Sequence, residues 1–203
     1  MISDKHLTQL IEAAIFSSST PLSIKKLKEK LLAQYLVPSI KIKQTLASIQ
    51  TDYQNRGVNL VEVASGYQFQ IKAEHNDDIA LLSEEKPQKY SRALLETMAL
   101  IAYKQPITRG EIEDVRGVAV SSHIIKTLVE RQWVKVVGHK EVPGRPSMYA
   151  TTKEFLDYFS LKSLEQLPEL MPIAKSAITD STMQDIMSKS TQVSQSIETE
   201  TKQ

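Results

Sequence analysis

Three carboxylates stand close together at Glu111, Glu113 and Asp114, and paired carboxylates can carry general acid–base chemistry. They fall, however, at the predicted start of a helix, where the helix dipole stabilises negative side chains. Thr108 stands three residues before Glu111, which is the spacing of a capping box. We therefore interpret these carboxylates as capping and solvated groups rather than as catalytic residues.

Other reaction chemistry finds no support in the residue spacing. The four histidines, His6, His75, His123 and His139, stand at no metal-ligand spacing, and a metal centre needs three or four converging ligands. The sequence has no cysteine, no glycine-rich phosphate loop and no Gly-x-Ser-x-Gly elbow. We expect no catalytic residue, no metal and no cofactor, and therefore a protein that is not an enzyme.

Basic and polar side chains offer a different chemistry, which is contact with nucleic acid. They are expected on two helices and on one hairpin: Lys41, Lys43, Gln44, Thr45 and Ser48; Ser121, Ser122, His123, Lys126, Thr127 and Arg131; and Lys135, His139, Lys140 and Arg145. Specific readers of DNA favour arginine, asparagine and glutamine, and before Arg131 these helices offer one glutamine. The formal net charge is only +1. Non-specific contact with phosphates through the hairpin stays open as an alternative.

The elements that must position these side chains form a predicted repeat of three helices and a hairpin. In its first copy, apolar spacing predicts helices over residues 4–17, from Ser23 to Leu32, and from Pro38 onwards with Ile40 on the apolar side. We expect a left-handed cap at Gly57 to end the third helix. Alternating residues at 58–63 and 67–71 predict two strands.

The second copy begins after a polar stretch at residues 77–89. Ser91, Thr108 and Ser121 or Ser122 are the expected caps of three helices, and Gly117 is expected to end the second of them. The third helix is predicted to bury Ile124, Ile125, Leu128 and Val129. The runs 133–137 and 147–149 predict a hairpin around the Pro-Gly and Arg-Pro steps, and a short helix follows at 153–159.

Three helices followed by a hairpin are typical of a winged-helix domain, a relative of the helix-turn-helix. Setting Pro21 on Pro106 also aligns Ser23 with Thr108, which favours one fold used twice. We predict a mainly α fold with small β-hairpin wings, made of two tandem winged-helix domains and a disordered C-terminal tail. The predicted ranges are 1–86, 87–170 and 171–203, the last being rich in serine, threonine and glutamine.

Composition sets the compartment that we expect. No apolar run reaches the length of a membrane-spanning helix, and the first residues lack the pattern of a signal peptide. With no cysteine for disulfides, we expect a cytoplasmic protein without a membrane partner.

Protein docking is the other common use of such domains, because interface hot spots favour aromatic residues and arginine. Tyr103, Arg109, Arg145 and Tyr149 lie at predicted helix ends and around the hairpin, so we expect them to border a partner-binding or wing-packing surface. For Trp133 we favour packing inside the domain. Arg145 could instead cap its own turn, in which case only stability would depend on it.

Several runs of the second copy resemble the bacterial segregation and condensation protein B family. These are residues 95–113, 115–117, 128–131, 137–146, 149–152, 155–159 and 161–168, which include Leu95-Glu-Thr-Met-Ala-Leu-Ile-Ala-Tyr-Lys-Gln-Pro and Val142-Pro-Gly-Arg-Pro. The first copy resembles the family only in pattern, through Leu-Ile-Glu-Ala-Ala-Ile-Phe, Pro-Leu-Ser and Gly-Tyr-Gln-Phe. The sequence departs from many members at Gly110 and in the loop 33–38.

The resemblance implies a non-enzymatic subunit of a structural-maintenance-of-chromosomes (SMC) complex, active in chromosome condensation and partition during cell division. It implies a homodimer formed largely through residues 1–86, which binds a kleisin, segregation and condensation protein A. The SMC ATPase would be reached only through the kleisin, DNA contact would be weak and non-specific at most, and the protein would be associated with the nucleoid. The alternative is a winged-helix transcriptional regulator that binds DNA.

Overall fold

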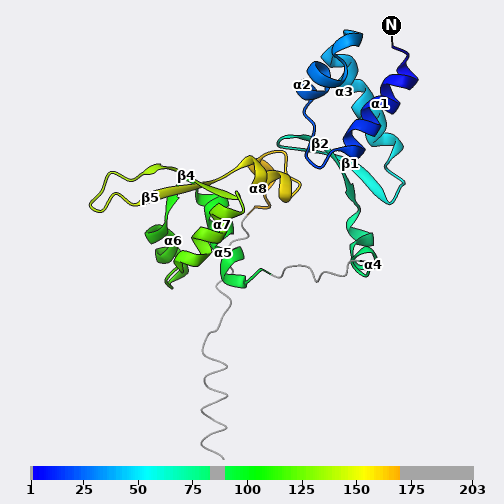
Figure 1. Ribbon diagram of the computed structural model, residues 1–203. Coiled ribbons are helices and arrows are strands. Elements are labelled where there is room, and N and C mark those ends of the chain that lie inside the picture. Colours follow the sequence, from blue (N-terminus) through cyan, green and yellow to red (C-terminus); the bar gives the residue numbers. More distant parts are fainter. Residues whose placement is uncertain (1, 83–89, 170–203) are drawn as a thin grey trace, which may run out of the picture. The chain divides into compact units, whose positions relative to one another are not determined.

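The computed structural model describes residues 2–82 and 90–169, and within them two winged helices follow one another (Figure 1). The first consists of α1 (Asp4–Ser17), α2 (Ile24–Lys26), η1 (Leu27–Leu31), η2 (Ala33–Tyr35), α3 (Ser39–Asp52), β1 (Val58–Val63) and β2 (Gly66–Ile71), followed by η3 (Ala73–His75) and α4 (Asn76–Ala80). The second consists of α5 (Arg92–Lys104), β3 (Ile107–Thr108), α6 (Arg109–Arg116), α7 (Ser122–Glu130), β4 (Val134–His139), β5 (Ser147–Thr151), α8 (Lys153–Tyr158) and η4 (Leu164–Gln166).

Hydroxyl side chains start most of these helices, as the sequence predicts. The side chains of Ser23, Ser91, Thr108 and Ser121 each accept a hydrogen bond from a backbone N–H in the first turn that follows. Gly117 ends α6 in the left-handed conformation, with φ of 69°. The confirmed caps fix where the short helices of both winged helices begin and end.

The first core lies between α1, α3 and the hairpin. Its buried side chains come from α1, from η1 and its C-cap, from α3 and from β1: Leu7, Ile11, Ile15, Leu27, Leu32, Ile42, Leu46, Ile49 and Leu60. The hairpin is antiparallel, with Val58 opposite Ile71 and Val63 opposite Gly66. Leu22 and Tyr67 exchange two backbone hydrogen bonds of 2.9 and 3.0 Å, which tie the chain before α2 to the hairpin.

The second core is covered by a three-stranded sheet of order β3-β5-β4, where the sequence predicts only a two-stranded wing. Ile107 and Thr108 pair with Tyr149 and Met148 and form the additional strand. Two residues are too few to show the alternation that predicts a strand. The sequence therefore identifies Thr108 only as the N-cap of α6. Trp133 is 3% exposed, which confirms that it packs inside the domain.

Three expectations for the first winged helix are wrong in detail. The α3 helix ends at Asp52 with Tyr53 in the right-handed region, and Gly57 does not adopt a positive φ; a left-handed residue occurs instead before α3, at Leu36, with φ of 51°. Ile40 is 64% exposed, because it lies in the first turn of α3 ahead of the buried Ile42. The second helix changes from α-helix to π-helix at Leu27.

No helix of the described ranges 2–82 and 90–169 is long and apolar enough to span a membrane. The expected domain boundary at 86/87 and the expected tail over 171–203 lie outside the residues that the structure describes.

Candidate partner-binding groove

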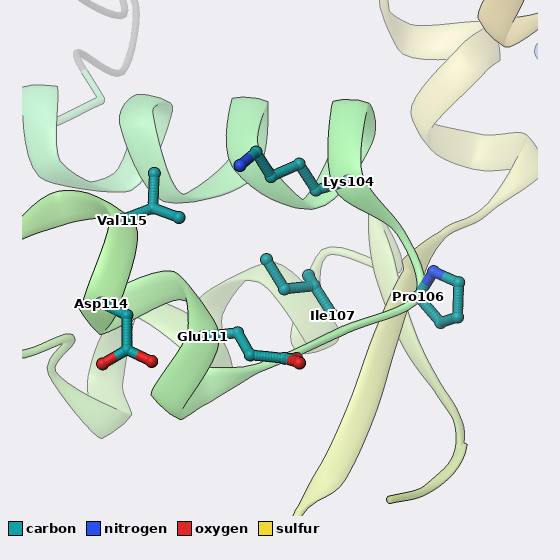
Figure 2. A pocket seen from close by; sticks show the side chains of 6 residues that line it. All are labelled: Lys104, Pro106, Ile107, Glu111, Asp114 and Val115. Atoms are coloured by element: carbon teal, nitrogen blue, oxygen red, sulfur yellow. The ribbon is translucent and has the colours of Figure 1, made fainter.

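The predicted carboxylate cluster borders a pocket between the end of α5 and α6, with a volume of about 350 Å³. Figure 2 shows Glu111 and Asp114 extending from α6 and Lys104 from the last turn of α5, around Pro106, Ile107 and Val115. The pocket is lined by two carboxylates and one ammonium group. Whether acid–base chemistry fits there depends on the protonation state of Glu111.

Glu111 is committed to structural contacts. Its Oε2 accepts hydrogen bonds from the Thr108 N–H and hydroxyl, both at 2.8 Å, and its Oε1 lies 2.7 Å from Lys140 Nζ. The Lys140 ammonium, followed by the two Thr108 donors, lowers the pKa of Glu111 to about 2. A carboxyl with this pKa stays ionised near neutral pH, which suits a cap and a wing anchor rather than a proton carrier.

The Glu111 contacts predict a specific pH dependence. Because its pKa falls from the ordinary 4.5 to about 2 in the folded chain, its stabilisation is present above pH 4.5 and is lost as the pH falls through 2. Glu111→Gln keeps the capping geometry but removes the charge. We expect it to lose less than about 1 kcal/mol at neutral pH, since the side chain is 40% exposed.

Urea unfolding at several pH values checks this prediction. The stability difference between wild type and Glu111→Gln should shrink between pH 4.5 and 2. The exposed Glu154 provides a control for the loss of one negative charge, and at neutral pH Glu154→Gln should destabilise the chain less than Glu111→Gln does. A Glu111→Gln difference that is constant over this range would contradict the assignment.

A more apolar groove of about 410 Å³ lies on the second winged helix where α6, α7 and the sheet meet. It is lined by Arg109, Ser122, Ile125, Lys126, Val129, Glu130, Val136 and Tyr149. Val129 and Val136 are 40% and 48% exposed, although both are aliphatic. An apolar floor with a polar rim is the usual anatomy of a protein-docking surface.

Arg109 is held in place at the start of α6. Its Nε donates to Glu113 Oε1 at 3.0 Å and its Nη1 donates to the Ser122 hydroxyl at 2.9 Å. The Val120 N–H donates to the same Glu113 oxygen, and together with Arg109 it lowers the pKa of Glu113. The guanidinium therefore joins α6 to α7 at the rim of the groove.

Tyr149 reaches the groove from β5, the middle strand, where it pairs with Ile107 on one side and Val136 on the other. It is half-buried and packs against the second core. The side chain thus combines wing packing with groove lining, the two roles that the sequence leaves open for it.

The other two predicted residues lie elsewhere. Tyr103 is half-buried in the last turn of α5 and is absent from the residues that line this groove. Arg145 stands at the hairpin tip with φ of 38°, and its Nη2 donates to Glu141 Oε1 at 3.2 Å. The structure therefore brings Arg109 and Tyr149 together and leaves Tyr103 and Arg145 outside.

Val129 and Val136 are the groove residues that sequence reasoning missed. The apolar stripe of Ile124, Ile125, Leu128 and Val129 predicts Val129 in the core, but Leu128 is fully buried and Val129 is 40% exposed. Val136 belongs to the alternating run of β4, in which Val134 takes the buried position. On α7 the signal was the pair of neighbouring aliphatic residues Leu128 and Val129, which one buried face cannot accept together. Val134 and Val136 share a face of β4 by alternation, so the pattern gave no signal for the exposure of Val136.

Several of the basic side chains around the wing and the groove are paired with carboxylates, whereas the exposed Lys135 of β4 forms no ion pair within the described ranges. The ion pairs are Arg109–Glu113 at 3.0 Å, Lys126–Glu130 at 3.6 Å, Lys140–Glu111 at 2.7 Å and Arg145–Glu141 at 3.2 Å. On α3, Lys41 pairs with Asp4, and Thr45 is buried with its hydroxyl donating to the Lys41 carbonyl. Each of these paired cations would have to leave a carboxylate to neutralise a phosphate, which disfavours DNA contact here.

Among residues 2–82 and 90–169, no three histidine, aspartate or glutamate side chains gather as metal ligands would.

Residues 9–170 match the family model of the segregation and condensation complex subunit ScpB. The segregation and condensation protein B homolog of Coxiella burnetii is 55% identical over 161 residues, which cover 79% of this chain and 77% of the relative.

Solved structures are also similar to the chain. ScpB from Mycobacterium tuberculosis is 27% identical and covers 79% of this chain and 99% of that one, with a TM-score of 0.36. A dimer of the ScpB N-terminal domain complexed with ScpA peptide is 20% identical and covers 42% of this chain and 92% of that one, with a TM-score of 0.30.

Proposed function

Because the chain belongs to the ScpB family of segregation and condensation complex subunits, we propose that it is a non-enzymatic adaptor that binds the kleisin of an SMC complex as a homodimer. In this proposal residues 1–86 carry the dimer contact, residues 87–170 form the second winged-helix domain, and residues 171–203 form a tail. The adaptor serves chromosome condensation and partition during cell division, in association with the nucleoid.

The observation that carries the proposal is the groove around Arg109 and Tyr149. Its floor holds two valines that are close to half exposed, and its cations are already paired with carboxylates. Covering the apolar area of such a surface with another protein lowers the free energy of the complex. Phosphate binding is instead favoured by cations that are not already paired. A kleisin segment with an apolar face is the occupant that fits it.

A flexible kleisin segment loses conformational entropy when it is ordered on the adaptor, and a large buried surface must offset that loss. One groove of about 410 Å³ accepts only a few side chains. Binding by a dimer would present the groove twice, and linked contacts raise the overall affinity without requiring a stronger single contact.

Alanine substitution of the four predicted residues tests the assignment. We expect Arg109→Ala and Tyr149→Ala to weaken kleisin binding about tenfold, since both line the groove and belong to residue types that dominate interfaces. Tyr103→Ala and Arg145→Ala should have smaller effects, below about threefold. Titration calorimetry with the purified kleisin measures each affinity.

Tyr149→Phe is the matched control, because it retains the ring that packs on the core. It should keep both the thermal stability and the kleisin affinity of the wild type. If all four alanine variants left affinity and thermal stability unchanged, the residue assignment would be wrong. Steeply salt-dependent binding to one DNA duplex instead would favour a regulator.

A further inference from the structure

Positive charge is concentrated on the helix-turn-helix part of the first winged helix. Residues 23–50, which span α2, η1, η2 and most of α3, hold six lysines and one glutamate, a net charge of +5. The whole chain has a formal net charge of only +1, so the other residues together carry negative charge. A local excess of this kind creates a positive potential that the average composition hides. An anionic partner is therefore attracted to this part of the chain.

Most of these lysines are exposed and are not engaged by carboxylates. The exposed ones lie on α2, η1 and α3: Lys25, Lys26, Lys28, Lys30 and Lys43. Over residues 2–82 and 90–169, none of these five forms an ion pair. They can therefore meet an anion without first breaking an ion pair, unlike the paired cations around the second wing.

The helices that carry these lysines are the ones with which a helix-turn-helix meets DNA. In that motif the second helix lies in the major groove, and the first crosses the phosphate backbone. Here α3 and α2 take these places and lie beside one another (Figure 1). The exposed polar side chains of α3 include Lys43, Gln44, Ser48 and Thr51, and Asp52 at its end is its first acidic residue. Nearly the whole length of α3 is therefore free of charges that would repel phosphate.

We infer that the lysines of α2, η1 and α3 bind the phosphates of duplex DNA without reading its sequence. Lysine is a flexible point charge that neutralises phosphate, whereas bases are read mostly by arginine, asparagine and glutamine. Residues 23–50 contain no arginine and no asparagine. Phosphate contacts position a protein on DNA but carry no sequence information. The surface goes beyond the adaptor function, since it needs neither the kleisin nor the groove around Arg109 and Tyr149.

An anionic membrane is the rival partner, because Leu36 in the same segment is 89% exposed. Helices that bind in the plane of a membrane bury an apolar face in the lipid. The apolar side chains of α2 and η1 are used differently, since Leu27 is buried in the first core and Ile24 and Leu31 pack against it. These two elements present lysines without an exposed apolar face, which favours DNA over lipid.

Fluorescence anisotropy of the full chain with short labelled duplexes tests the inference. Two duplexes of unrelated sequence should bind with equal affinity, because only phosphates are contacted. The affinity should fall about 100-fold between 50 and 200 mM salt, which is the dependence for roughly four phosphate contacts.

A pair of matched double variants locates the surface. Lys28→Gln/Lys30→Gln removes two charges and keeps a good helix former at both positions. It should lower the salt slope by about two and weaken binding at low salt about tenfold. Lys135→Gln/Lys153→Gln changes the net charge equally at two exposed lysines of the second winged helix, and should weaken binding less than about threefold. Since Lys135 belongs to β4, this control also tests phosphate contact through the wing.

Three results would overturn the inference. They are equal losses in the two double variants, a strong preference for one duplex, and capture of phosphatidylglycerol vesicles or polyglutamate but not of DNA. Arg109→Ala and Tyr149→Ala should leave DNA binding unchanged, and Lys28→Gln/Lys30→Gln should leave kleisin affinity unchanged. A chain that ignores the kleisin yet binds both duplexes equally would therefore remove the proposed function and keep this inference.

Discussion

Replacing Gly66 by alanine is expected to remove about 3 kcal/mol or more of the stability of the first winged helix. Gly66 has φ of 147°, and a Cβ there would lie 2.3 Å from the Leu22 carbonyl carbon, 2.4 Å from its oxygen and 2.5 Å from the Ser23 nitrogen. All three are backbone atoms and cannot move aside as a side-chain end could. The substitution should separate Leu22 from Tyr67 and open the first core.

Urea unfolding followed by two probes checks this result. Trp133 is the only tryptophan of the sequence and lies in the second core, so its fluorescence reports on the second winged helix. Far-ultraviolet circular dichroism reports on both. In Gly66→Ala we expect an early loss of dichroism that is not accompanied by the Trp133 change.

Gly110 provides the matched control, because a Cβ at this position meets nothing within 4 Å. Gly110→Ala lies in the first turn of α6 and should be neutral or stabilising by up to about 1 kcal/mol. If Gly66→Ala were as stable as Gly110→Ala, the close approach of the hairpin to Leu22 would be wrong.

Replacing Val129 by glutamate is expected to weaken kleisin binding about 100-fold, equivalent to about 2.7 kcal/mol. The side chain lies in the groove and is 40% exposed before binding, so a partner that covers it would desolvate the new carboxylate. Since Val129 is already in contact with water, the free chain should remain folded.

Val118→Glu is the control for this substitution. Val118 is 57% exposed in the same winged helix but lies outside the groove, so the same change of residue type should leave the affinity nearly unchanged. Titration calorimetry of both variants with the kleisin separates them. Equal affinities for the two variants would place the kleisin contact away from Val129.

Features that depend on neighbours in sequence were predictable from the residues. The capping box of Thr108 and Glu111 joins groups three residues apart, and the sequence predicts it correctly. The Gly117 cap and both hairpins are local in the same sense. Much of the winged-helix fold can therefore be predicted from residues that are close together in the sequence.

Features that depend on distant partners were not predictable. The strand β3 exists only because Ile107 pairs with Tyr149 across the sheet. The ion pair that anchors the wing joins Glu111 to Lys140, which are 29 residues apart in the sequence. The exposure of Val129 follows from how α7 packs, which an apolar stripe alone does not define. The π-turn at Leu27 is local, but the apolar spacing does not distinguish it from a continuous α-helix.

The candidate site was predictable only in part. Residue type and position around the wing single out Arg109 and Tyr149, which the structure brings into one groove. The same reasoning singles out Tyr103 and Arg145, which lie outside it. Position near a wing is thus a weak guide, because the fold decides which face each side chain joins.

Size-exclusion chromatography with light scattering tests the central claim most directly, on the chain alone and mixed with the kleisin from its own cell. We expect a dimer that shifts completely into one larger complex containing one kleisin. A dimer that ignores the kleisin, yet shifts with a defined DNA duplex, would contradict the adaptor function and favour the regulator.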